Sequence, residues 1–135
     1  MNPPPRTVLF ACVHNAGRSQ MAEFLFNALA DPAKAVARSA GTEPASAVAP
    51  NVVAVLKELG LDASRAVPRR LTAEAVDLLV TMGCGEACPV VPGLRREDWP
   101  LADPKGQPPE RVREIRDEIR ARVVALLARE GWGQE

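Results

Sequence analysis

The sequence predicts an α/β fold in which a parallel β-sheet is flanked by helices, and two observations support this prediction. Short apolar runs with β-branched members alternate with longer segments whose apolar residues recur every three or four positions. The first four segments read strand, helix, strand, helix, an order typical of parallel strands joined by crossover helices. The chain has 135 residues, 47% of them hydrophobic, which is enough for one sizeable core. We therefore expect a single domain over residues 1–135.

The first half of the chain contains two strands and two helices. Residues 7–13 are mostly apolar, as expected for a strand buried on both faces. From about Arg18 an apolar stripe with helical spacing continues until Pro32 interrupts it. Residues 35–39 are interpreted as a second strand, and the helix after it is expected to end at Gly60. The two helical stripes consist of Met21, Phe24, Leu25, Ala28 and Leu29, and of Val52, Val53, Leu56 and Leu59.

The second half contains the remaining elements. Residues 77–82 hold a third buried strand, which leads into a loop over 83–89 that contains two glycines and two cysteines. A fourth strand is expected between residues 94 and 101. After Pro108 and Pro109, an apolar stripe with charged residues between its members predicts a final helix. This stripe consists of Val112, Ile115, Ile119, Val123 and Leu126.

The composition argues against several classes of partner and location. Seventeen Lys and Arg residues balance seventeen Asp and Glu residues, so no overall field attracts nucleic acid or an anionic membrane surface. The N-terminal apolar run is far shorter than a signal-peptide core or a membrane span, and we expect a cytoplasmic protein. Three cysteines without an export signal favour catalytic, redox or metal-binding thiols over a disulfide framework.

The loop after the first strand has the composition of an oxyanion site. Cys12 ends the strand and Arg18 begins the helix, and parallel sheets bind ligands beyond the carboxyl ends of their strands. Such a loop can direct its N–H groups at a tetrahedral oxyanion while the Arg18 guanidinium binds two oxygens. The same field favours the Cys12 thiolate, the form that attacks, and Ser19 can donate a hydrogen bond to it. On this pattern alone, however, a cysteine that finishes a buried strand is usually a small core residue. The expected substrate-binding residues are Val13, His14, Asn15, Ala16, Gly17, Arg18 and Ser19.

The surrounding residues resemble one family over nearly the whole chain. Segments 8–15 and 18–23 are similar to the first strand, loop and helix start of the arsenate reductase and low-molecular-weight tyrosine phosphatase superfamily. Further similar segments are 39–42, 80–84, 97–99 and 103–104. This resemblance implies a four-stranded parallel sheet flanked by helices, the flavodoxin-like low-molecular-weight tyrosine phosphatase fold.

The resemblance also implies roles for individual residues. Cys12 would be the nucleophile, Arg18 the oxyanion clamp and Asn15 a residue that shapes the loop. Asp103 would protonate the leaving oxygen, although an aspartate before a proline is also common in an ordinary turn. His14 departs from the family pattern, and we interpret it as a residue at the edge of the substrate, because a stabilised thiolate needs no base.

Two further cysteines favour reduction over hydrolysis. A phosphatase needs only one cysteine, whereas a reductase must also dispose of two electrons. Cys84 follows the third strand, beside Cys12 if the sheet is parallel, and Cys88 lies four residues later, close enough for a disulfide. We expect Cys84 to attack the Cys12 adduct and form a transient Cys12–Cys84 disulfide. Cys88 would then form the redox disulfide Cys84–Cys88, in a segment that resembles thiol-coupled arsenate reductases.

The preferred function is reduction of arsenate to arsenite, a step of arsenic detoxification, without a tightly bound cofactor. Phosphate and sulfate are expected to compete as oxyanions. Thioredoxin is the expected external thiol reductant, with glutathione, glutaredoxin or mycothiol as alternatives. The chain also lacks the tyrosines that family phosphatases usually carry after the Asp-Pro pair, where Lys105 and Gly106 stand instead.

Other readings of these residues remain open. The same Cys12, Arg18 and Asp103 are also compatible with a low-molecular-weight protein tyrosine phosphatase or aryl phosphatase. A non-enzymatic oxyanion or redox sensor would use Cys84 and Cys88 as its reporting pair. Both cysteines are alternatively inert and buried, or ligands of a metal, although two thiolates and one histidine are too few for a closed zinc site. We therefore expect no metal.

Overall fold

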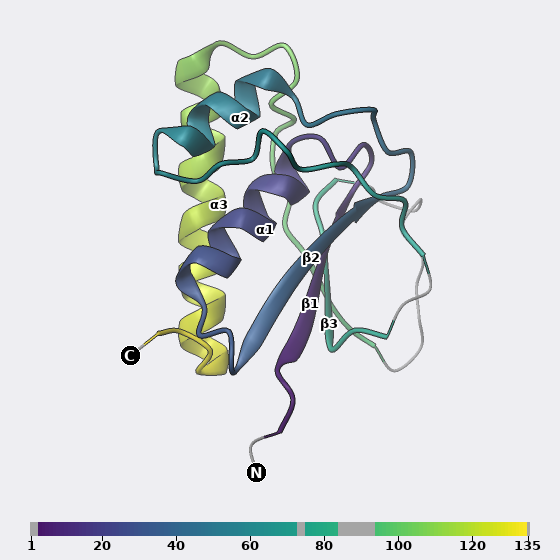
Figure 1. The fold of residues 1–135 in the computed structure, drawn as a ribbon, viewed down its shortest axis with the longest axis vertical. Helices are drawn as coiled ribbons and strands as arrows, with labels where there is room; N and C mark the ends of the chain where they lie inside the picture. Colours follow the sequence, from purple (N-terminus) through teal and green to yellow (C-terminus); the bar gives the residue numbers. More distant parts are fainter. Residues whose placement is uncertain (1–2, 73–74, 84–93, 135) are drawn as a thin grey trace.

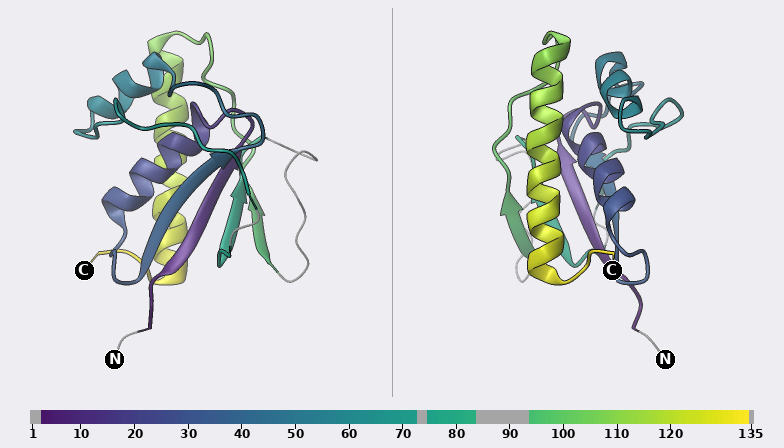
Figure 2. Two further views of the ribbon diagram at one scale, coloured as in Figure 1. Left: turned by 45° about the vertical axis from the view of Figure 1, so that its right-hand side comes forward. Right: turned by 90° about the vertical axis from the view of Figure 1, so that its left-hand side faces the viewer.

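The computed structural model describes residues 3–72, 75–83 and 94–134 (Figures 1 and 2). Within these ranges one sheet has the strand order β2-β1-β3-β4, and every neighbouring pair is parallel. This arrangement confirms the predicted four-stranded parallel sheet. The strands are β1 (Arg6–Cys12), β2 (Ala35–Gly41), β3 (Leu78–Thr81) and β4 (Arg95–Asp98), and the helices are α1 (Arg18–Leu29), α2 (Pro50–Lys57) and α3 (Pro109–Glu130).

The element boundaries agree with the sequence pattern and differ only in detail. The second helix ends at Lys57, two residues before the last member of its predicted stripe, and the chain then turns through Gly60, whose φ is 78°. The final helix begins at Pro109 and ends before Gly131, which has the left-handed conformation typical of a helix end. Among the described residues, no helix is long and apolar enough to cross a membrane.

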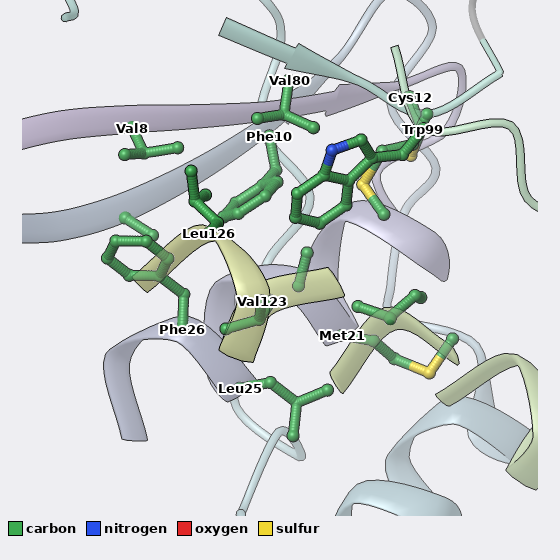
Figure 3. Close-up of a cluster of buried hydrophobic side chains, with 14 of the residues drawn as sticks. Val8, Phe10, Cys12, Met21, Leu25, Phe26, Val80, Trp99, Val123 and Leu126 are labelled. Atoms are coloured by element: carbon green, nitrogen blue, oxygen red, sulfur yellow. The ribbon is translucent and has the colours of Figure 1, made fainter. Parts of the chain in front are cut away.

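The main core lies between the sheet and the three helices. Alternate residues of β1 face this core, and Phe10, which is fully buried, lies against Phe26 of α1 and Trp99 (Figure 3). The ring centroids are 5.9 Å apart for Phe10 and Phe26 and 5.5 Å apart for Phe10 and Trp99. Cys12, two residues further along β1, belongs to the same cluster. The last residue of β1 is therefore anchored in the core.

Alternating strands and helices suggest a sheet with helices on both faces. The face opposite the main core is covered differently in the described residues. Its buried cluster is small and consists of Leu9, Ala11, Ala40 and Leu79. The partly buried residues described as packing against it are Val13, Leu71, Val76 and Leu94. None of these four lies in a helix. In the described part of the chain, the three helices thus contribute to one face, and irregular segments contact the other.

The strand order brings two loops together at the carboxyl edge of the sheet. β1 lies between β2 and β3, and Ala11 near its end is in register with Thr81 at the end of β3. The segments that leave β1 and β3 therefore start side by side. A ligand bound after β1 is also within reach of residues that follow β3.

An ion-pair cluster joins α2 to α3 on the helical side. Arg116 of α3 is buried, and its Nη1 donates hydrogen bonds to the Val55 carbonyl oxygen at 2.9 Å and to Glu58 Oε1 at 2.8 Å. Arg113 donates to both carboxylate oxygens of Glu58. Hydrogen bonds from Arg113 and then Arg116 lower the pKa of Glu58. The contribution of Glu58 to stability is therefore present at neutral pH and is lost as the pH falls through its folded-state pKa.

We predict that Glu58→Gln lowers the thermal midpoint by a few degrees at pH 7, because it removes one of the two anionic partners described for the buried Arg116, the other being Asp117. The difference from the parent should shrink as the pH falls through the lowered folded-state pKa of Glu58, because the carboxyl group then becomes protonated in the folded chain as well as in the unfolded one. Thermal unfolding, monitored by circular dichroism at neutral and at acidic pH, measures the difference in thermal midpoint and its pH dependence. Glu114→Gln is the matched control, since the Arg111–Glu114 pair is exposed and should contribute little. Equal effects of the two substitutions, or no pH dependence for Glu58→Gln, would contradict the prediction.

Candidate functional site

The loop between β1 and α1 lies at the carboxyl edge of the sheet, where the sequence predicts the site. Cys12 is the last residue of β1, and only 3% of its surface is exposed. Arg18 is the first residue of α1, so the helix N-terminus faces the end of the loop. The loop thus joins a sulfur anchored in the core to the positive end of a helix dipole.

The backbone of this loop is held by the segment that follows β2. Residues 42–49, here called the strap, run beside the loop and donate hydrogen bonds to its outward carbonyl oxygens. The donors and acceptors are Thr42 N to Cys12 O (3.2 Å), Glu43 N to Val13 O (2.8 Å), Ala45 N to His14 O (2.9 Å) and Ala49 N to Ala16 O (2.9 Å). These bonds use the carbonyl oxygens of the loop and none of its N–H groups. The loop N–H groups are therefore free of the strap and can cradle an anion.

Gly41 makes the close approach of strap and loop feasible. A Cβ at this position would lie 2.5 Å from the Val13 carbonyl oxygen and 2.9 Å from the Asn15 backbone nitrogen. Both contacts are with backbone, which cannot move aside without displacing the loop. Gly41 also exchanges backbone hydrogen bonds with the segment of Arg69 and Leu71, which fixes it from the other side.

A chain of hydrogen bonds leads to the sulfur of Cys12. Ser19 Oγ lies 2.8 Å from Cys12 Sγ, as the sequence predicts. Asn15 Nδ2 donates to Ser19 Oγ at 2.8 Å. Asn15 is completely buried and has a φ of 51°, a left-handed conformation that asparagine tolerates better than most residues. This conformation turns the loop at Asn15.

The Arg18 side chain connects the loop to two other segments. Its Nη1 donates to the Leu101 carbonyl oxygen at 3.2 Å, and its Nη2 lies 3.9 Å from Asp103 Oδ2. Gly83, with a φ of 97°, lies directly against the guanidinium, and a Cβ there would collide with it. Only 12% of the Arg18 side chain is exposed. Its guanidinium is therefore held at the site before any anion binds.

Asp103 shows features of both interpretations that the sequence left open. Its Oδ1 accepts a hydrogen bond from the Lys105 backbone at 3.0 Å, which is the geometry of an Asx turn. Its other oxygen, Oδ2, faces Arg18. The Pro104 ring packs on Gly17, and the Pro104 carbonyl oxygen accepts a hydrogen bond from Asn51 of α2 at 3.0 Å. The turn thus holds the carboxyl group above the anion loop.

A cavity of about 390 Å³ opens over Cys12. His14, Arg18 and Asp103 line it on the polar side, and three strap alanines form an apolar wall, namely Ala45, Ala47 and Ala49. His14 is exposed, and its Nδ1 pairs with the Glu43 carbonyl oxygen at 3.0 Å, which suits a residue at the substrate's edge. Among the residues that the structure describes, no cluster of three His, Cys, Asp or Glu side chains could hold a metal ion.

Most of the predicted site residues that the structure describes line one cavity, namely Cys12, His14, Ala16, Gly17, Arg18 and Asp103. Asn15 and Ser19 are buried beside Cys12, whereas Val13 packs against the cluster on the opposite face of the sheet. Cys84 and Cys88 lie outside the described residues. The residues that sequence reasoning missed are those that hold the site from a distance. Asn51 and the strap carry no motif, because their contribution is made largely by backbone hydrogen bonds and a single amide. The sequence did mark Gly41, because it lies in the 39–42 segment that resembles the family.

Known proteins resemble this chain over most of its length. The family model for low molecular weight phosphotyrosine protein phosphatase matches residues 7–131. A putative arsenate reductase from Halobacterium salinarum is 40% identical over 87% of this chain and 88% of its own. A glutaredoxin arsenate reductase from Synechocystis is 35% identical over 92% of this chain and 98% of its own. The solved thioredoxin-dependent arsenate reductase from Corynebacterium glutamicum superposes with a TM-score of 0.80 at 41% identity, over 95% of this chain but 63% of that longer chain.

We predict that Gly41→Ala weakens the binding of inorganic phosphate by more than about tenfold, because the new methyl group displaces the loop backbone at Val13 and Asn15. Isothermal titration calorimetry measures the affinity. Gly133→Ala is the control, since a Cβ there meets nothing within 4 Å. Unchanged phosphate affinity in Gly41→Ala would show that the loop does not depend on this contact.

Proposed function

Because this chain belongs to the low molecular weight phosphotyrosine protein phosphatase family and closely resembles its arsenate reductases, we propose that it reduces arsenate to arsenite in the cytoplasm. The observation that carries the proposal is the position of Cys12 at the floor of an oxyanion loop that Arg18 completes. The named relatives, which are 35–40% identical over nearly their full lengths, favour reduction over hydrolysis as the reaction of this site.

The first step joins Cys12 to arsenic. Arsenate would bind with its oxygens toward the loop N–H groups and the Arg18 guanidinium, which offset its negative charge. The Cys12 thiolate attacks arsenic, so a sulfur–arsenic bond forms and one arsenic–oxygen bond breaks. Asp103 donates a proton to the departing oxygen, which leaves as water. Support for this role comes from the carboxyl group of Asp103, which lines the cavity above Cys12.

The second step transfers two electrons. The Cys84 thiolate attacks the Cys12 sulfur, and the electron pair of the sulfur–arsenic bond stays with arsenic, which is thereby reduced and leaves as arsenite. The Cys88 thiolate then attacks Cys84, which restores the Cys12 thiolate and leaves the Cys84–Cys88 disulfide. In total, one arsenate and two thiols give one arsenite, one disulfide and one water.

Two contacts support Cys84 as the second nucleophile. β3 pairs with β1 in parallel, and Gly83, the residue before Cys84 in the chain, lies against the Arg18 guanidinium. The chain therefore reaches Cys84 directly from a residue that contacts the anion loop.

The reductant of the Cys84–Cys88 disulfide is proposed to be thioredoxin. A dithiol protein is suited to reduce a disulfide formed by two nearby cysteines. The solved relative from Corynebacterium glutamicum is described as thioredoxin-dependent, whereas the Synechocystis relative is described as a glutaredoxin arsenate reductase. Supplying arsenate with thioredoxin, thioredoxin reductase and NADPH, and then with glutathione and glutaredoxin, distinguishes the two by the loss of NADPH. Release of phosphate from an aryl ester without any arsenite would favour a phosphatase instead.

Cys12→Ser should lower both arsenate reduction and aryl phosphate hydrolysis by more than about a thousandfold, because a serine hydroxyl is not ionised near neutral pH and forms no adduct. Arsenite release and p-nitrophenol release measure the two activities. The variant should still bind phosphate, since the loop N–H groups and Arg18 remain, and this binding controls for misfolding. Retention of either activity would remove Cys12 from its proposed role.

Cys88→Ser should stop the relay after one turnover. Treated with arsenate and no reductant, then quenched in acid, this variant should carry a Cys12–Cys84 disulfide and release one equivalent of arsenite. The parent protein should carry Cys84–Cys88 under the same conditions. Peptide mapping by mass spectrometry identifies the pairs. A Cys12–Cys88 disulfide in Cys84→Ser, with multiple turnover retained, would mean that the order of the two thiols is reversed.

A further inference from the structure

Gln20 is a buried polar residue in the first turn of α1. It is 2% exposed, and its neighbours Met21 and Ala22 are completely buried apolar residues. Its Oε1 has no hydrogen-bond partner in the described part of the chain. Burying such an amide costs stability relative to an apolar side chain of similar size. The hydrogen bond from its Nε2 to Asn15 Oδ1, at 3.0 Å, therefore points to a role in the loop.

The Arg69 backbone determines which way the Asn15 amide faces. The Arg69 N–H lies 2.9 Å from Asn15 Oδ1, and because a backbone N–H only donates, the atom opposite it must be the oxygen. Gln20 Nε2 donates to the same oxygen. With both donors on Oδ1, the amide nitrogen of Asn15 faces Ser19 Oγ.

This orientation of the Asn15 amide leaves the Ser19 hydroxyl group to donate a hydrogen bond to the Cys12 sulfur. Ser19 Oγ accepts from Asn15 Nδ2 and keeps its single hydroxyl proton to donate to Cys12 Sγ, 2.8 Å away, when Cys12 is a thiolate that can only accept. A thiolate is stabilised by such a donor, and each hydrogen bond in a buried chain strengthens the next. The direction of every bond, from Gln20 through Asn15 and Ser19, favours negative charge on Cys12.

We propose that Gln20 is a positioning residue, which stabilises the Cys12 thiolate through Asn15 and Ser19. The inference deepens the proposed function, because it concerns the nucleophile of the same reaction. It explains why a polar side chain is kept at a position where an apolar one would pack without an unmet acceptor. Replacing Gln20 by Met should thus leave the thermal midpoint unchanged or raise it, while making Cys12 a weaker thiolate.

The thiolate is measured directly by alkylation. Cys84→Ser combined with Cys88→Ser leaves Cys12 as the only cysteine, so the pH dependence of iodoacetamide alkylation reports Cys12 alone. Adding Gln20→Met should move the alkylation midpoint upward by about half to one pH unit, and lower the alkylation rate below the midpoint by about three- to tenfold. Gln20→Leu should do the same. An unchanged midpoint in both variants overturns the proposal.

A double-mutant cycle with Ser19→Ala separates positioning from a general packing effect. Ser19→Ala should raise the midpoint by itself, and Gln20→Met should add nothing in its presence, because Gln20 acts through the missing hydroxyl. Additive effects would overturn the proposal. Asn27→Leu is the matched control on the same helix, since it removes hydrogen bonds between Asn27 and Ala37 and should leave the midpoint unchanged.

The alkylation experiment does not depend on arsenate. If the parent chain with all three cysteines releases no arsenite, but Gln20→Met still moves the midpoint, the proposed function fails and the positioning role stands. If arsenite is released and the midpoint does not move, the positioning role fails alone.

Discussion

The outward direction of the loop carbonyl oxygens is the constraint on which the site depends. Four backbone N–H groups of the strap, residues 42–49, hold these oxygens. A backbone held in this way presents its own N–H groups to the opposite side, where an anion can replace water as their partner. The arrangement requires β2 to lie beside β1 and requires Gly41 where the two segments touch. The parallel pairing of two strands and one missing side chain thus shape the anion site.

The reactive groups are held by the core and by segments far apart in the sequence. Cys12 belongs to the main apolar cluster at the end of β1, so its sulfur is fixed by the packing of Phe10 and its neighbours (Figure 3). Arg18 is held by Leu101 and Gly83 and faces Asp103. Gly83 follows β3, whereas Leu101 and Asp103 lie between β4 and α3. Because these groups are arranged before substrate binds, little ordering is needed when an oxyanion enters.

Reduction and hydrolysis share the first half of this chemistry. A thiolate, an arginine clamp and an acid suffice to form an adduct with either arsenic or phosphorus, and Cys12, Arg18 and Asp103, which are proposed for these roles, line one cavity. What separates the two outcomes is a second thiol within reach of the first. That requirement is why the contact of Gly83 with Arg18 is important for the proposal, since the next residue in the chain is Cys84.

The sequence by itself determined the order of the elements, the parallel sheet and the Cys12–Arg18 loop. These depend on local patterns: apolar periodicity, helix-ending residues and the short span between a strand end and a helix start. Even the contact of Ser19 with Cys12 followed from that span, whereas the pairing of Cys84 with Cys88 stays a prediction. Tertiary structure alone decided the partners of the loop, namely the strap, Asn51 behind Pro104 and Gln20 behind Asn15. It also decided that irregular segments, including Leu71 and Val76, contact the second face of the sheet. These contacts join residues distant in the sequence, and single amides or backbone groups make many of them. No residue pattern marks such groups before the chain is folded.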